Sequence, residues 1–208
     1  MGRRLTHLSV AGAALALVAS LAAHAIASAE APLAIDTARV TIDGTSNIHA
    51  YTASTTKVRV TRAQLGAAVA GTEFWDNVLK PGAVATFEIA IPAATLTSPR
   101  EGLDKNMHKA LKVQEHADIT FRLVRFEVKE NAPGETRAIG MLQIAGVERE
   151  VTLNITTKRA GSTMAVRGRV DLLMTDYGIT PPKAMLGMLK TDPKVTVTFE
   201  TVLTIPLT

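Results

Sequence analysis

VTLNITTKRAGSTMAVRGRVDLLM, Val151 to Met174, contains two runs that alternate apolar and polar residues on either side of a turn signal, Ala160-Gly161-Ser162. Successive side chains of a strand point to opposite faces, so each run has one apolar face and one polar face. This pattern favours antiparallel strands with one face in water, because parallel strands that are covered on both sides read as continuous apolar runs.

The same period of two recurs along the chain, in runs that begin at Ala85, Ile119, Leu142 and Val195. Further turns are predicted at Asn131-Ala132-Pro133-Gly134 and Ala145-Gly146. With further strands expected in 34–42 and in 55–60, the sequence predicts about eight strands at hairpin spacing and an all-β fold. A closed antiparallel barrel and a two-sheet sandwich both bury one face of every strand. The segments 118–129 and 194–205 are long, and strand tilt in a barrel uses such length, so we favour the closed barrel.

A short helix is predicted from Glu101 to about Gln114. Leu103, Met107 and Leu111 stand at steps of four there, and no β-branched residue precedes Val113. A helix this short needs a sheet to pack on. We therefore expect it to cap one open end of the barrel.

A second short helix is predicted after Pro181-Pro182. Proline suits the first helical turn, and Met185, Met188 and Leu189 then fall on one stripe. The preceding segment 176–180 would turn the chain, with Gly178 free to adopt a positive φ. This segment is interpreted as a second cap, either a core plug or a lid over an apolar ligand.

The N-terminus is typical of a secretory signal peptide over residues 1–29. Arg3 and Arg4 precede an apolar run, and Ala27-Ser28-Ala29 is a suitable cleavage site. The mature chain, 30–208, fits a single domain located in the periplasm. It has no later run of the roughly 18 apolar residues that a transmembrane segment needs. The chain has no cysteine, which excludes both a disulfide framework and a lipid anchor on cysteine.

Charge and aromatic content argue against a nucleic-acid partner. The chain carries 23 Lys and Arg against 19 Asp and Glu, with the basic residues scattered singly. Aromatic residues make up 4% of the chain, which leaves few platforms for stacking bases.

Catalytic and metal-binding readings have little support, and no cofactor is expected. Ser46 and His49, with Asp43 nearby, resemble a nucleophile and a base, but no nucleophile elbow or oxyanion-hole signature accompanies them. A turn in which Ser46 bonds to the backbone is the favoured interpretation. His108 and His116 are eight residues apart, too far along a helix axis to share a metal ion.

Four motifs resemble the YceI-like family of periplasmic lipid-binding proteins. They are GTSNIH (44–49), MHKALKVQEHADITF (107–121), IAGVEREVTL (144–153) and MTDYGITPPKAMLGMLKTDPKVTV (174–197). The resemblance covers Ile35 to Ile205. It implies a lipocalin-like antiparallel barrel that holds a polyisoprenoid or another long-chain amphiphile, such as an isoprenoid quinone, a fatty acid or an amide, for transport, storage or a stress response.

The residues predicted to contact such a ligand share the apolar faces of the strands and of the second cap. The methionines among them suit a cavity that adapts to a flexible chain. The predicted set is Phe87, Ile89, Ile91, Phe121, Leu123, Leu142, Val151, Leu153, Met164, Val166, Leu172, Met174, Met185, Met188 and Phe199.

Two other classes of protein share parts of this pattern. An outer-membrane barrel requires aromatic girdles, whereas Trp75 is the only tryptophan, and Tyr51 and Tyr177 are the only tyrosines. A periplasmic interaction module or stress adaptor without a ligand fits the sequence and stays open as the alternative. A homodimer through an exposed edge or helix also stays open.

Overall fold

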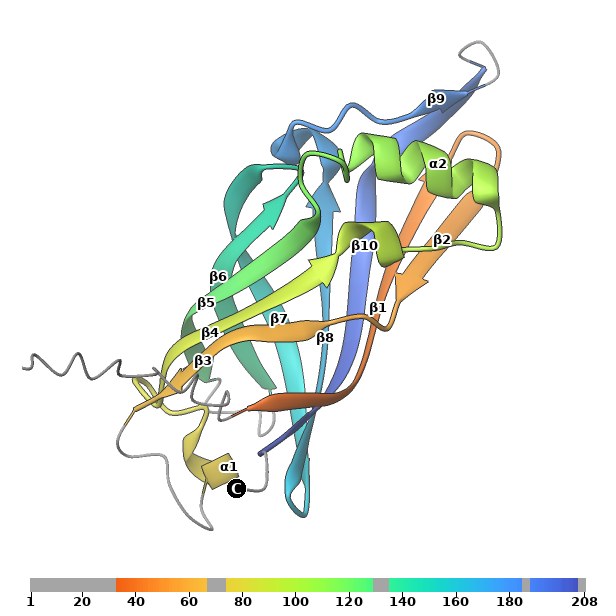
Figure 1. Cartoon of the computed structure of the whole chain (residues 1–208). Helices are drawn as coiled ribbons and strands as arrows, with labels where there is room; N and C mark the ends of the chain where they lie inside the picture. The colour runs from red at the N-terminus through yellow and green to blue at the C-terminus, as the bar shows by residue number, and fades with distance from the viewer. Residues whose placement is uncertain (1–32, 67–73, 129–134, 185–187, 206–208) are drawn as a thin grey trace, which may run out of the picture.

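One strongly curled antiparallel sheet makes up most of the molecule (Figure 1). The structure is a computed structural model that describes residues 33–66, 74–128, 135–184 and 188–205. The predicted signal peptide therefore lies outside the described residues. The strands are β1 (Ala34–Ser46), β2 (Ala50–Thr55), β3 (Arg59–Leu65), β4 (Val84–Pro92), β5 (Asp118–Val128), β6 (Glu135–Ile144), β7 (Val147–Ala160), β8 (Thr163–Leu173), β9 (Lys183–Ala184) and β10 (Leu189–Thr204).

The strands are ordered β2-β1-β10-β8-β7-β6-β5-β4-β3, and β9 pairs with β10 off this path. Strands β3 to β8 are therefore a meander, and β10 inserts between β8 and β1. The all-β antiparallel prediction is confirmed. The predicted closure of the barrel is not confirmed. Among the described residues no ladder joins the two end strands, β2 and β3, although they are consecutive in the chain. The free edge of β2 is bridged instead at Ser54, which pairs with Thr97.

The strand predicted in 55–60 is wrong, and the strand number rises above eight as a result. Thr55 ends β2 and Arg59 begins β3, so this segment is a crossover between two strands. The Thr55 hydroxyl accepts a hydrogen bond from the Lys57 N–H at 3.0 Å and lies 2.8 Å from the Thr95 hydroxyl. A threonine that bonds locally to the backbone in this way competes with a strand ladder.

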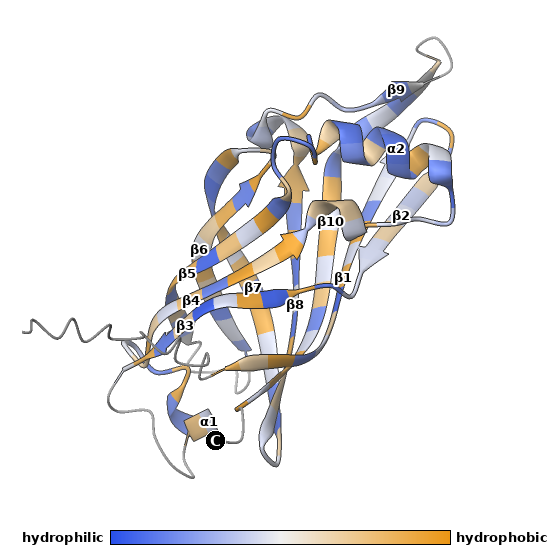
Figure 2. Ribbon diagram, in the orientation of Figure 1, coloured by the Kyte–Doolittle hydropathy of each residue, from blue (hydrophilic) through white to orange (hydrophobic). Residues whose placement is uncertain are grey.

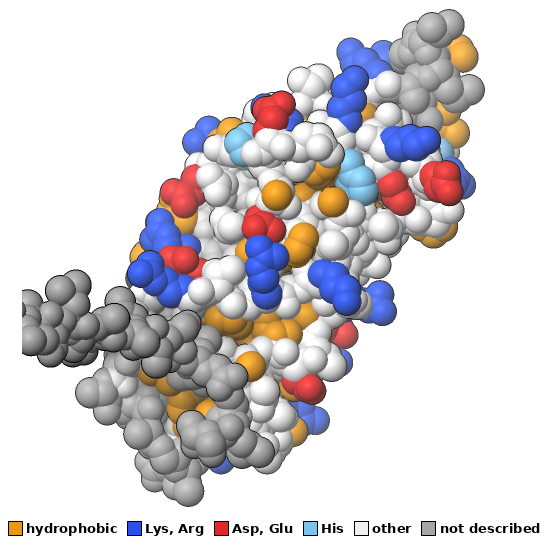
Figure 3. Space-filling view, in the orientation of Figure 1, with side chains coloured by type: hydrophobic (Ala, Val, Ile, Leu, Met, Phe, Trp, Pro, Cys, Tyr) orange, Lys and Arg blue, Asp and Glu red, His pale blue; other side chains and the backbone are white. Residues whose placement is uncertain are grey.

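The two faces of the sheet have opposite chemistry, as Figure 2 shows in alternating colours along the strands. On the face seen in Figure 3, charged side chains are spread over the surface rather than gathered in one patch. They form ion pairs across strands, such as Lys194 to Asp171 at 2.9 Å and Arg167 to Glu200 at 3.3 Å. The hydrogen bonds from Lys194 and Thr196 hold the pKa of the Asp171 carboxyl below its ordinary value.

Tight turns join the strands where the sequence predicted them. The hairpin between β6 and β7 places Ala145 at φ 49° and Gly146 at φ 84°, as the strand twist of a two-residue hairpin requires. A side chain on Gly146 would collide with the His116 ring, so the glycine is needed for space as well. The predicted turn at Asn131 to Gly134 lies outside the described residues.

The helix predicted at Glu101 is confirmed as α2 (Glu101–Ala110), which lies across one end of the curled sheet (Figure 1). A short helix that was not predicted, α1 (Phe74–Asn77), lies at the opposite end. Two 3₁₀ turns, Ala93–Thr95 and Met174–Tyr177, complete the helical structure of the described residues. None of these helices has the length and hydropathy that a membrane crossing requires.

The second predicted helix is wrong where the structure describes it. Lys183–Ala184 forms β9, which pairs with Leu189 and Lys190 at the start of β10. The Asn47 side chain holds this hairpin, since its amide N–H donates to the Met188 carbonyl and its oxygen accepts from the Lys190 N–H, each at 2.8 Å. These long-range bonds satisfy backbone groups that a helix would have to pair internally. Residues 185–187 lie outside the described residues.

Buried apolar residues form two clusters, one near each end of the sheet. The cluster at α1 contains Phe74, Trp75 and Met164, and the cluster at α2 contains Leu111, Ile119 and Tyr177 among others. Gly178 follows the Met174–Tyr177 turn with φ 65°, as predicted for this position. The middle of the lumen, between the two clusters, is left to a cavity.

Candidate functional site

The curled sheet surrounds an apolar cavity with two adjoining chambers. The inner chamber, of about 220 Å³, extends from the middle of the sheet to α1. The mouth chamber, of about 520 Å³, lies beneath α2. Together they fall in the range of roughly 300 to 1,000 Å³ that is usual for small-molecule sites. The residues that line both chambers, and so mark their boundary, are Ile42, Ile119, Ile144, Leu172 and Val197.

Strand parity places most of the predicted ligand-contact residues around the inner chamber. The lining residues from this set are Phe87, Ile89, Ile91, Phe121, Leu123, Leu142, Leu153, Met164, Val166, Leu172 and Phe199. They come from six strands, namely β4 to β8 and β10. Alternation within a strand was sufficient to choose the face, because neighbouring strands in register present the same face together.

Four residues of the predicted set are placed elsewhere. Met174 lines the mouth chamber instead of the inner one. Val151 is half-buried and pairs with Gly140, over which the Phe121 ring lies, and it lines neither chamber. Met188 is 66% exposed in the β9–β10 hairpin, so its predicted position inside a lid is wrong. Met185 lies outside the described residues.

Aromatic rings lie against the wall because glycines in the neighbouring strand leave room for them. The Phe199 ring occupies the place of a side chain on Gly168, its direct partner in the β8–β10 ladder. The Phe121 ring covers Gly140 in the same manner. Glycine within a strand often marks such a close approach. Rings held against the wall project less into the lumen, which helps to leave the inner chamber open.

The end of the inner chamber next to α1 is called the floor from here on. It was not predicted from the sequence. Leu33, Trp75 and Val78 form it, and each is at most 6% exposed. The Phe74 and Trp75 rings meet edge to face with centroids 4.9 Å apart. An interval of four residues between Phe74 and Val78 was the available signal, but one turn of helix is too short to give a clear period.

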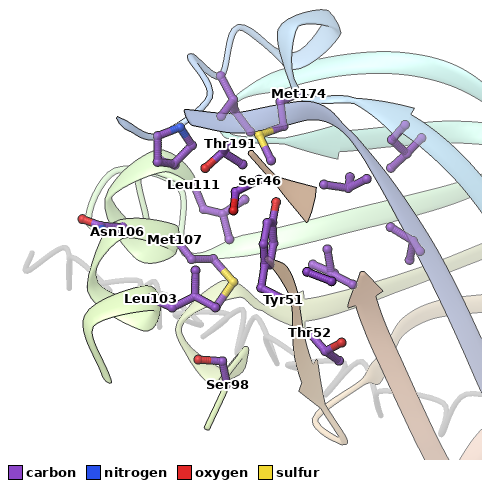
Figure 4. A pocket seen from close by; sticks show the side chains of 18 of the residues that line it. Ser46, Tyr51, Thr52, Ser98, Leu103, Asn106, Met107, Leu111, Met174 and Thr191 are labelled. Carbon is purple, nitrogen blue, oxygen red and sulfur yellow. The ribbon is translucent and has the colours of Figure 1, made fainter. Parts of the chain in front are cut away.

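The mouth chamber is lined by apolar side chains from α2 and by polar groups from the strand ends (Figure 4). Leu103, Met107 and Leu111, the predicted apolar stripe of the helix, point toward the chamber. Tyr51 of β2 points into it from the facing wall. The helix thus covers the mouth with its apolar side.

Tyr51 carries a hydrogen-bonding group of the mouth chamber that has no partner. Its hydroxyl is buried and makes no hydrogen bond within the described residues. Burial raises the pKa of this phenol, and the nearby Asp192 carboxylate raises it further. The hydroxyl therefore stays neutral, and it is available to donate a hydrogen bond to a ligand.

Ser46 and His49 are engaged in a turn, as the favoured interpretation expected. The Ser46 hydroxyl donates to the His49 carbonyl at 2.8 Å and accepts from the backbone N–H groups of Ile48 and His49. The His49 Nε2 atom lies 2.8 Å from Nη1 of Arg100, and a guanidinium can only donate. The imidazole therefore faces a guanidinium instead of the Ser46 hydroxyl. Within the described residues no group of three or more His, Cys, Asp or Glu side chains is arranged to hold a metal ion.

Comparison with known proteins identifies this architecture. The sequence profile of the YceI-like domain matches residues 34–203, which is most of the chain. The chain belongs to the YceI-like family. No protein of curated function shows a significant sequence match.

Solved YceI-like and related structures share the fold at low sequence identity. BcnA from Burkholderia cenocepacia is 12% identical, with a TM-score of 0.61 over 79% of this chain and 95% of that one. A polyisoprenoid binding domain from Saccharophagus degradans, implicated in plant cell wall breakdown, is 12% identical, with a TM-score of 0.62 over 85% of this chain and 100% of that one. The YceI protein of Campylobacter jejuni is 11% identical, with a TM-score of 0.55 over 99% of this chain and 92% of that one.

Proposed function

We propose that this YceI-like protein is an exported binding protein that holds one long-chain amphiphile in its two-chamber cavity. The ligand is a polyisoprenoid or a related chain, such as an isoprenoid quinone, a fatty acid or an amide, which the protein carries or stores in the periplasm. The basic and apolar segments of residues 1–29, with their Ala27-Ser28-Ala29 site, support export.

The observation that carries the proposal is the apolar character of the inner chamber. No charged side chain among the described residues lines it, and nearly all of its described walls are aliphatic or aromatic. Each methylene group removed from water contributes roughly 0.8 kcal/mol, so a chain of several isoprene units binds without any charged contact. The ligand tail would contact the inner-chamber residues, and Met174 would contact the part of the ligand in the mouth chamber.

Family membership supports a binding role over a catalytic one. The Saccharophagus degradans relative is described as a polyisoprenoid binding domain. In the mouth chamber, the Tyr51 hydroxyl supplies a neutral donor for the polar end of a ligand. A ligand-free adaptor would have no need for a cavity that joins an apolar interior to such a group.

Native mass spectrometry of protein released from the periplasm tests the proposal, with lipid extraction to identify the adduct. Leu153→Gln and Asn154→Gln make a matched pair, because Leu153 lines the inner chamber and Asn154 is exposed on the outer face. We expect the wild type and the Asn154→Gln variant to carry a lipid adduct, and the Leu153→Gln variant to lose it. Freshly isolated wild type with no adduct, and with no affinity for added chains, would favour the adaptor function instead. The mature mass gives the N-terminus, expected at Glu30.

A further inference from the structure

Among the described residues, the hydrogen-bonding side chains that line the inner chamber gather at its α1 end, around the floor. They are Trp75, Thr157 and Thr201, and the other described lining residues are apolar. Thr157 lies near the end of β7, and Thr201 near the end of β10, on the side of the molecule where α1 lies (Figure 1). Polar groups scattered by chance would not be confined to one end of the chamber.

The sheet register places the two threonines in one row. Val166 of β8 is paired with Thr157 on one side and with Thr201 on the other, so Thr157, Val166 and Thr201 share one row on the inner face. Val166 packs against the buried cluster that contains Trp75. The row of threonines therefore lies beside the buried cluster to which Trp75 belongs.

An ion pair fixes α1 over this row. Nη1 of Arg159 lies 2.9 Å from a carboxylate oxygen of Asp76. Arg159 is two residues beyond Thr157 on the same side of β7, and Asp76 directly follows Trp75. The ion pair thus links α1, which carries the indole, to the end of β7, which carries Thr157.

The indole nitrogen at the floor has no hydrogen-bond partner. Trp75 is 5% exposed, and its Nε1–H group is buried without an acceptor in the described structure. Thr157 and Thr201 are half-buried, and their hydroxyls make no hydrogen bond within the described residues. A buried donor is normally paired, because leaving it unpaired forfeits its hydrogen bond to water. The floor consequently offers one obligatory donor and two hydroxyls that either donate or accept.

We propose that the floor is a polar subsite for an uncharged oxygen acceptor, such as a ketone, amide, ether or hydroxyl oxygen, at the inner end of the bound chain. This inference rests on the proposed function, since it requires a chain in the lumen. An uncharged group fits because the part of the chain that the structure describes places no charged side chain in the chamber lining, and the nearby Arg159 is already paired with Asp76. The ligand therefore carries oxygen at the end that reaches Trp75, and a plain hydrocarbon end leaves the subsite unfilled.

The test compares two probes of equal chain length, hexadecan-2-one and hexadecane, on delipidated full-length protein. Trp75 is the only tryptophan, so emission excited selectively at tryptophan, outside the absorption of the two tyrosines, reports on the floor alone. We expect hexadecan-2-one to shift the emission to longer wavelength, because its oxygen accepts from the indole N–H, and hexadecane to leave it unshifted or to shift it the other way. Competition between the two probes, followed by native mass spectrometry, gives their relative affinity.

The Thr157→Val/Thr201→Val variant removes two of the three groups and keeps the shape of the side chains. We expect its preference for hexadecan-2-one over hexadecane to fall about tenfold relative to wild type. The control is Thr156→Val/Thr198→Val, which makes the same two changes on the outer faces of the same strands and should keep the wild-type preference.

The outcomes separate this inference from the proposed function. Failure of both probes to bind the wild type would overturn the proposed function and the subsite with it. Binding of both probes with an unchanged preference in the threonine variant, and with the same emission for both, would overturn the subsite alone. In that case ordered water pairs the floor groups, and the chain ends in hydrocarbon.

Discussion

The two ends of the cavity are closed by helices of very different burial. At the floor, α1 places Phe74 and Trp75 in the core, each 5% exposed, although the helix is only four residues long. At the mouth, the ten-residue α2 has no buried residue, and its apolar stripe covers the larger chamber. Local opening requires little free energy where few apolar contacts are lost. We therefore expect ligands to enter and leave beneath α2, while α1 stays in place.

The largest effect in this comparison is expected from Trp75→Ala. Truncation of a fully buried aromatic residue destabilises a protein by about 3 to 5 kcal/mol, whereas Met107→Ala in the half-exposed stripe of α2 should cost about 1 kcal/mol. Urea unfolding followed by circular dichroism measures both changes in the free energy of unfolding. Equal destabilisation by the two variants would contradict the view that α1 is held more firmly in the core than α2.

A second prediction concerns the wall between the two ends. In Gly168→Ala the new methyl group overlaps the Phe199 ring, which must turn into the inner chamber. We expect a loss of about 1 to 3 kcal/mol in stability from overpacking, and weaker binding of long chains by about tenfold. Gly102→Ala is the control, because nothing lies within 4 Å of the added methyl group on α2. Unchanged chain affinity in Gly168→Ala would show that the ring finds another place.

Alternation predicted the wall because it is a local property that the whole sheet reinforces. Leu123 shows both its success and its limit, since the residues up to Leu123 follow the period and a bulge between Leu123 and Arg125 then shifts it. Val124 within the bulge is 47% exposed, and beyond it Phe126 lines the inner chamber, where strict alternation from Leu123 would point it outward. A strict period of two does not anticipate such a bulge, because the extra residue is decided by pairing with β6.

The errors at the ends have a common physical cause. The segment after Pro182 has a good helical stripe, but its backbone pairs with β10 in the β9–β10 ladder instead. Its Met188 carbonyl accepts a hydrogen bond from Asn47, which is 141 residues away in sequence. The floor depends on Trp75 meeting strands that follow it by more than 80 residues. Local propensity carries no information about such partners, so tertiary contacts decided both ends.

The third prediction is a pH effect at the mouth. Burial raises the pKa of Tyr51 in the folded state, so above the ordinary pKa of about 10 the unfolded chain loses this proton first. Stability should therefore fall as pH rises from about 10 toward the folded pKa. Tyr51→Phe removes this contribution, although Tyr177, whose pKa burial also raises, keeps its own. Thermal melts across the alkaline range should show a shallower loss in Tyr51→Phe than in wild type, and parallel curves would contradict the assignment.

The smallest effect is expected at Met188, where the sequence alone predicted a lid. Its side chain is 66% exposed, and the part of the residue that the fold uses is its carbonyl, which accepts from Asn47. Met188→Asp leaves that bond in place and puts the new carboxylate in water near the exposed Lys190, so neither stability nor chain affinity should change measurably. Met107→Asp carries the same charge to the lining of the mouth chamber and should weaken chain binding, because a carboxylate there loses water when the ligand enters. Chain affinities of the two variants, measured side by side, decide which segment covers the cavity. Loss of binding in Met188→Asp with retention in Met107→Asp would return that role to the β9–β10 hairpin.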